Sequence, residues 1–117
     1  MERTFMPLVR YTVAALAFIA AVPLSAQSSF EGAGETSTLD CDGGTAAITG
    51  AGNTIIVTGG CAELVIEGAD NRVRVDLARK GSIRITGASN RVSWTTPDGS
   101  KPIVKVVGAG NSVSRAK

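Results

Sequence analysis

Gly50-Ala51-Gly52-Asn53 is one of four near-copies of the tetrapeptide that decides the fold of this chain. The others are Gly68-Ala69-Asp70-Asn71, Gly87-Ala88-Ser89-Asn90 and Gly108-Ala109-Gly110-Asn111, with a degenerate fifth copy at Gly32-Ala33-Gly34-Glu35. The fourth positions recur at a period of about 18–21 residues, which is typical of a solenoid, in which stacked coils contact only their neighbours.

Apolar and polar residues alternate on both sides of each tetrapeptide, as they do in half-buried strands. After the asparagine, apolar residues lie two and four positions downstream, as Ile55 and Val57 do. Before it, they lie seven and five positions upstream, as Ala46 and Ile48 do. We therefore expect an all-β fold, a small parallel β-helix-like solenoid of 4–5 coils of about 18–21 residues, with two short strands in each coil.

The tetrapeptide is interpreted as the corner between the two strands of a coil. Glycine adopts backbone angles that other residues resist, and asparagine tolerates the left-handed region. Asparagines stacked in register also form ladders of hydrogen-bonded amides. We assign a structural role to the corner residues Gly50, Asn53, Gly68, Asn71, Gly87, Asn90, Gly108 and Asn111.

Residues 1–26 have the pattern of a secretory signal peptide. Two arginines precede an apolar run over residues 13–24, and small residues end at Ala26. The run is shorter than the roughly 20 apolar residues that span a bilayer. We predict that residues 1–26 contact the membrane only transiently, and that residues 27–117 form one exported domain, periplasmic or extracellular.

Both cysteines lie in the predicted exported domain. Cys41 is six residues after Glu35 and Cys61 is eight after Asn53, so they occupy similar places on consecutive coils. Stacked strands are about 4.8 Å apart, within the Cα separation of a disulfide. Two thiols in a sequence without histidine are a poor metal-ligand set. We predict a disulfide, typical of an oxidising compartment, and neither a metal site nor a cofactor.

Charge is segregated along the chain. Residues 27–70 carry seven acids and no base, and residues 71–117 carry ten bases and two acids. The net charges of these halves, −7 and +8, nearly cancel. If the chain winds steadily along one axis, one end of the stack is acidic and the other is basic.

Five cations of the second half are predicted to point outward. Arg84 and Lys105 fall in one column, a repulsive arrangement unless an anion is nearby. The default interpretation of the five is a solvated face. The alternative is one face for an anionic partner, which is an envelope polymer, lipid headgroups, an acidic protein or a second copy of the chain. Export and a single tryptophan argue against nucleic acid. The predicted face consists of Arg72, Arg74, Arg84, Arg91 and Lys105.

No catalytic residue is predicted. The absence of histidine removes the commonest general base and triad member. The alternative is a polysaccharide-acting enzyme or a carbohydrate-binding β-helix, with acids near Asp40, Asp42 and Glu63 meeting bases from later coils. The charge segregation places those acids and bases at opposite ends, so we expect a non-enzymatic interaction or structural module. Asp40 and Asp42 are interpreted as a solvated acidic turn.

The reiterated Gly-x-x-Asn corners between Val/Ile strands resemble the bacterial family called domain of unknown function 3060. The resemblance covers about Cys41 to Val113, most of the predicted exported domain. It implies a β-solenoid in the cell envelope or outside the cell, and it transfers no activity and no functional residue. Glu35 departs from the pattern, so residues 27–40 are predicted to be an N-terminal cap instead of a full repeat.

Overall fold

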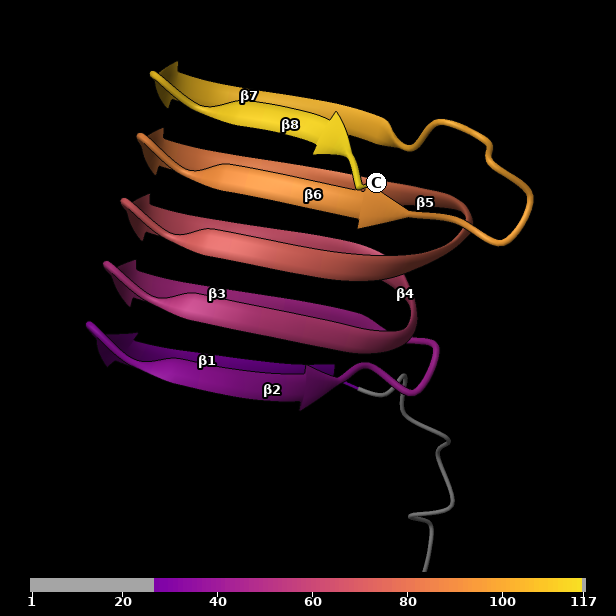
Figure 1. Ribbon diagram of the computed structural model, residues 1–117, viewed down its shortest axis with the longest axis horizontal. Coiled ribbons are helices and arrows are strands. Elements are labelled where there is room, and N and C mark those ends of the chain that lie inside the picture. Colours follow the sequence, from indigo (N-terminus) through magenta and orange to yellow (C-terminus); the bar gives the residue numbers. More distant parts are fainter. Residues whose placement is uncertain (1–26, 117) are drawn as a thin grey trace, which may run out of the picture.

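The computed structural model describes residues 27–116, and the predicted signal peptide, residues 1–26, lies outside the described residues. Residues 27–116 form a β-solenoid of about five turns, with strands as its regular elements (Figure 1). This part of the chain contains no helix long and apolar enough to cross a membrane. The strands are β1 Gln27–Ala33, β2 Thr36–Asp40, β3 Thr45–Ala51, β4 Thr54–Ala69, β5 Arg72–Ala88, β6 Arg91–Thr95, β7 Ile103–Ala109 and β8 Ser112–Arg115.

Each coil consists of two strand segments that pair in parallel with the next coil. β1, β3, the second halves of β4 and β5, and β7 form one layer, here named the β1 layer. β2, the first halves of β4 and β5, β6 and β8 form the β2 layer. Figure 1 shows the stack advancing steadily from β1 and β2 (indigo) to β7 and β8 (yellow). We number the coils 1 (27–44), 2 (45–62), 3 (63–81), 4 (82–102) and 5 (103–116).

Two strands are longer than the sequence predicts. β4 has 16 residues and β5 has 17, because each continues from one coil into the next around the bend opposite the corner. The pairing of β4 with β5 shifts register around Cys61, where β4 bends. The other two bends, residues 41–44 and 96–102, contain no strand, and the longer one projects from the stack (Figure 1).

The core lies between the two layers. The apolar residues predicted to point inward in coils 2, 3 and 4 are all buried, and Cys41, Cys61 and Leu77 close the core on the side of the bends. Phe30 and Leu39 of coil 1 pack against one end. The predicted inward positions buried here are Ala46, Ile48, Ile55, Val57, Leu64, Ile66, Val73, Val75, Ile83, Ile85, Val92 and Trp94.

Coil 5 departs from this pattern. Val104 is 40% exposed and Val106 is 43% exposed, although the alternation predicts both as core. Both lie in register with buried residues of coil 4, but no further coil of residues 27–116 covers their other side. The guanidinium of Arg115 lies 4.7 Å from the centre of the Trp94 ring and partly covers that end.

The left-handed position of the corner is the third residue and not the asparagine. Asp70 and Ser89, both third residues, each have φ of 59°, whereas no asparagine of the described chain has a positive φ. The tolerance of asparagine for left-handed backbone is therefore not used at these corners. The asparagine side chains turn into the core instead, where Asn53, Asn71 and Asn90 are at most 1% exposed.

These asparagines form a continuous amide ladder. The Nδ2 group of Asn53 donates to Oδ1 of Asn71 at 3.1 Å, and that of Asn71 donates to Oδ1 of Asn90 at 3.0 Å. Asn90 donates in the same way to Asn111 at 3.0 Å. Each Nδ2 group also donates to the first corner glycine of the preceding coil. The ladder thus ties every corner to its neighbours on both sides.

Residues 27–40, predicted to be a cap instead of a repeat, form both strands of a complete coil. Its corner glycine, Gly32, pairs in register with Gly50. The backbone N–H of Glu35 donates to Oδ1 of Asn53 at 3.0 Å, as the asparagine N–H does in later coils.

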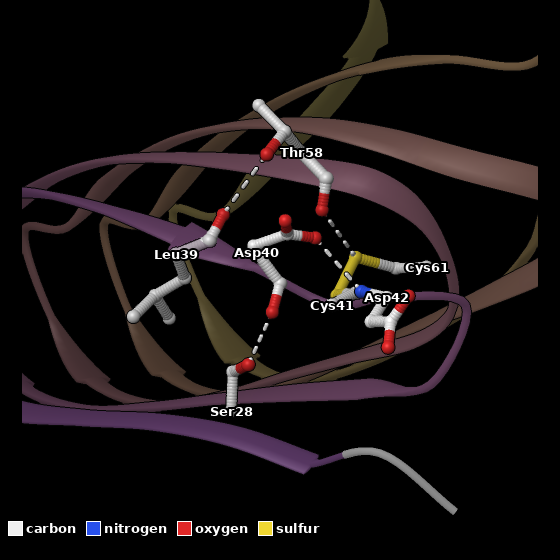
Figure 2. Close-up of a disulfide and its surroundings, with 7 residues drawn as sticks. All are labelled: Ser28, Leu39, Asp40, Cys41, Asp42, Thr58 and Cys61. Atoms are coloured by element: carbon white, nitrogen blue, oxygen red, sulfur yellow. Dashed lines mark hydrogen bonds between the residues drawn. A yellow bond between two sulfur atoms is a disulfide. The ribbon is translucent and has the colours of Figure 1, made fainter.

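The predicted disulfide between Cys41 and Cys61 is confirmed. It joins the bends of coils 1 and 2, its Cα atoms are 5.2 Å apart, and both cysteines are fully buried. Figure 2 shows it beside the acidic turn, where Oδ1 of Asp40 accepts the N–H of Asp42 at 2.9 Å. This contact agrees with the interpretation of Asp40 and Asp42 as a turn.

Removing the disulfide is expected to destabilise the fold. The double substitution Cys41→Ser/Cys61→Ser should lower the free energy of unfolding by about 3 kcal/mol, since the crosslink restricts the unfolded chain. Urea denaturation of the parent and the double variant measures the difference. A reducing agent should destabilise the parent and leave the variant unchanged. Equal midpoints for parent and variant would contradict a stabilising crosslink.

Candidate functional site

The net charge changes stepwise along the stack. Coil 1 carries four acids and no base, coil 2 carries no charge, and coil 3 carries four of each sign. Coil 4 carries three bases and one acid, and the described part of coil 5 carries two bases. Because the coils stack in sequence order, this order is also the order in space. The acidic end and the basic end are thus separated by an uncharged coil and a mixed one.

The predicted cation face is divided between the two layers. Arg72 lies beside Arg91 in the β2 layer, with Arg74 two residues further along the same strand. Arg84 lies beside Lys105 in the β1 layer. The prediction of one face is therefore wrong, because the corner after Ala88 separates the strand of Arg84 from that of Arg91. All five side chains are exposed.

The three arginines of the β2 layer, here named the arginine surface, border three neighbouring hollows. The first, of about 320 Å³, lies at the corner between Arg72 and Arg91. The second, of about 300 Å³, is bordered by all three arginines together with Ile56. The third, of about 290 Å³, lies between Arg74 and the bend. The hollows therefore follow the strand direction across the layer.

The second hollow, here named the central hollow, has the most positive surroundings of the three. It shares Arg72 and Arg91 with the first hollow and Arg74 with the third. It is bordered by three guanidinium-bearing residues and no acid. Asp70 lies at the corner hollow, and Asp76, which accepts a 2.6 Å hydrogen bond from the Thr95 hydroxyl, lies at the third. Within residues 27–116 the ion pair found is Arg79 with Asp98, at 3.7 Å, and it does not involve the arginine surface. The three exposed guanidinium groups thus form no ion pair with an acid of the described residues.

The cations of the β1 layer have a different setting. Arg84 and Lys105 border a smaller hollow of about 170 Å³. Glu63 borders the same hollow and reduces its positive charge. The β1 layer is therefore the weaker candidate for an anion.

Of the acids that the sequence singles out, Asp40 and Asp42 lie away from the arginine surface, whereas Glu63 meets Arg84 and Lys105 of later coils. Asp40 and Asp42 belong to coil 1, and the arginine surface belongs to coils 3 and 4. Among residues 27–116, no group of three or more His, Cys, Asp or Glu residues is placed to hold a metal ion. What the geometry provides is a row of guanidinium groups, which bind carboxylate and phosphate oxygens in bidentate fashion.

Sequence reasoning missed two features of this surface. Ile56 is 46% exposed beside Arg74 and supplies an apolar contact within the central hollow. Ser93 lies beside Arg74 on the next coil and leaves room for it. Both could have been found by aligning the coils at their asparagines, since residues equally far from the asparagine share one column.

These features define a class of protein, a small disulfide-linked β-solenoid whose exposed columns change from acidic to basic. The chain belongs to the family described as "Protein of unknown function (DUF3060)", whose model matches residues 48–112. The matched region runs from coil 2 to the first residue of β8 and includes the whole arginine surface. No curated protein and no solved structure matches the chain at a significant level.

Proposed function

We propose that this protein is an exported, non-enzymatic module that binds an anionic polymer of the bacterial envelope through the arginine surface. One observation carries the proposal: Arg72, Arg74 and Arg91 gather around a hollow that no acid borders. Stacked like charges repel each other, and a bound polyanion would relieve the repulsion. The row of hollows suits an extended chain better than a compact ligand.

The exported location is supported by two observations. Residues 1–26 have the composition of a secretory signal peptide. The Cys41–Cys61 disulfide is of a kind that persists in oxidising compartments. Both favour a place where acidic polymers of the cell envelope are accessible.

A binding role without turnover is supported by the distribution of acids and bases. The sequence contains no histidine, and hydrolysis by paired carboxylates requires two acids at one cleft. Asp40 and Asp42 are engaged in a turn two coils away from the nearest arginine of the arginine surface. Incubation should therefore leave the polymer chain length unchanged, and shortened products would contradict the non-enzymatic assignment.

The triple substitution Arg72→Gln/Arg74→Gln/Arg91→Gln is expected to weaken binding to polygalacturonate at least about tenfold, a loss of roughly 1.4 kcal/mol. Binding of the parent should also weaken as salt is raised, because salt screens exposed charges. Titration by fluorescence anisotropy with labelled polymer measures both effects.

The matched control for this triple variant removes the same charge elsewhere. Arg84→Gln/Lys101→Gln/Lys105→Gln neutralises three cations outside the arginine surface, and it should retain most of the affinity. If both triple variants lose affinity equally, net charge and not the arginine surface governs binding. If the parent does not bind polygalacturonate or polyphosphate at low salt, the proposal fails.

A further inference from the structure

The two ends of the stack present open strand edges. Within residues 27–116, β7 pairs only with β5 and β8 only with β6, so coil 5 has no neighbour on its outer side. β1 pairs only with β3 and β2 only with β4, so coil 1 is open in the same way. Open edges of this kind are templates for pairing with another chain.

The backbone groups at these two edges are complementary. Between coils, the N–H of the third corner residue donates to the corner alanine of the following coil, as Ser89 does to Ala109 at 3.0 Å. At the C-terminal end the equivalent donor is the N–H of Gly110, for which residues 27–116 supply no acceptor of this kind. At the N-terminal end the equivalent acceptor is the C=O of Ala33, for which the same residues supply no donor of this kind. The missing partner of each end is thus present at the other.

A second backbone hydrogen bond also links each corner to the next, but here the donor lies in the following coil and the acceptor in the preceding one. The N–H after each asparagine donates to the asparagine C=O of the preceding coil, as Ser112 does to Asn90 at 2.9 Å. The C=O of Asn111 and the N–H of Thr36 are the unused members of this series, at opposite ends of the stack. Donor and acceptor again match between the two ends.

The residue that replaces asparagine in coil 1 can reproduce the acceptor half of the ladder contact. In the ladder, each Oδ1 accepts from both the N–H and the Nδ2 group of the preceding asparagine, as Oδ1 of Asn111 does from Asn90 at 2.9 and 3.0 Å. Toward a preceding coil the ladder position therefore accepts through Oδ1, and it also donates through Nδ2 to the first corner glycine. Glu35 retains acceptor oxygens at that position, and the N–H and Nδ2 groups of Asn111 are the donors that no following coil uses.

Apolar surface and charge point to the same pairing. Val104 and Val106 are about two-fifths exposed at 40% and 43%, and they continue the inward columns of the core to the outer side of coil 5. Half-buried Phe30 of coil 1 lies in the same column as Val106, and Ser28 lies in the column of Val104. Leu39, also half-buried, belongs to the β2-layer column that ends at Arg115 in coil 5. The described part of coil 5 carries two bases, and coil 1 carries four acids. Uncovered apolar columns of one end would therefore be buried against an end of opposite charge.

We infer that the chain associates end to end, with coil 1 of one copy continuing the stack on coil 5 of another. Such a contact joins two different surfaces and leaves a free end on each side, so it propagates into open filaments instead of closing as a dimer. This inference goes beyond the proposed function and does not use Arg72, Arg74 or Arg91.

Sedimentation velocity of the protein purified after expression of the full chain tests the inference. The sedimentation coefficient of the parent should keep rising with protein concentration. Val106→Lys blocks the C-terminal end, and Glu35→Lys/Ser37→Lys blocks the N-terminal end. Each variant alone should stay monomeric, with the circular dichroism spectrum of the parent. An equimolar mixture of the two variants should form dimers and nothing larger, because each variant supplies one functional end.

Three results would overturn end-to-end association. The first is a parent that stays monomeric at every concentration, and the second is a mixture of the two variants that stays monomeric. The third is a dimer formed by the Glu35→Lys/Ser37→Lys variant alone, because such a dimer indicates contact between two C-terminal ends. The Arg72→Gln/Arg74→Gln/Arg91→Gln variant should still associate, and Val106→Lys should still bind polygalacturonate. Failure of one hypothesis is therefore distinguishable from failure of the other.

Discussion

Gly68→Ala is expected to cost at least about 4 kcal/mol of folding free energy and to lower the melting temperature by about 15 °C or more. A Cβ atom at this position would lie 1.8 Å from the carbonyl oxygen of Gly50, and the contact is with backbone that cannot rotate away. The φ of Gly68 is also 140°, a value that side chains resist. Coils 2 and 3 would have to separate at their corners. Thermal melting followed by circular dichroism measures the effect.

Gly60→Ala is the matched control for this substitution. Gly60 also has a positive φ, 62°, but no atom lies within 4 Å of the place that an alanine Cβ would take there. Only backbone strain of about 1–2 kcal/mol remains at this position. Equal melting temperatures for Gly60→Ala and Gly68→Ala would show that close stacking of the corners does not limit stability.

Asn71→Asp is expected to destabilise the fold by about 3–5 kcal/mol at neutral pH. Asn71 is fully buried, and its Nδ2 group donates to Gly50 C=O and to Oδ1 of Asn90, both at 3.0 Å. A carboxylate would turn both contacts into pairs of acceptors in a site closed to solvent. Urea denaturation at several pH values measures the loss.

The loss should depend on pH in a defined direction. Burial and acceptor neighbours raise the folded-state pKa of the introduced carboxyl above its unfolded value of about 3.9. The folded state then binds the proton more tightly than the unfolded state does. The stability of the variant is therefore closest to that of the parent below the unfolded-state pKa, and it falls as the pH rises above that value. Asn111→Asp, at the half-buried end of the ladder, should show a smaller loss at low protein concentration. A loss at Asn71 that is independent of pH would contradict a buried charge.

The repeat predicts the coil because each sequence position performs one local task. The spacing of the asparagines defines the coil length, and the alternation around residues such as Ile55 and Ile48 defines the inward columns. The Cys41–Cys61 pair follows from the same alignment, since the two cysteines lie at the bends of adjacent coils. These features depend on contacts between neighbouring coils, which a repeat makes visible in the sequence.

The failed expectations concern properties that one repeat does not contain. Val104 has the alternation of a core residue, but its exposure depends on whether another coil follows. Arg84 and Arg91 are both outward in their strands, and only the path around the corner places them on opposite layers. Backbone propensity alone favours asparagine at the left-handed position of the corner. The amide ladder instead requires the asparagine side chain to lie in the core of the solenoid.

The corners and the bends differ in their tolerance of added length. Every corner passes from one strand segment to the next through two residues, as at Asp70-Asn71, whereas the opposite bends range up to the seven residues of 96–102. The long bend leaves the pairing of β5 with β7 in register. We therefore expect loops inserted at the edge of the bends to leave the stacking intact, and loops inserted at the corners to disturb it. The edge of the bends is the place at which this scaffold should accept engineered loops.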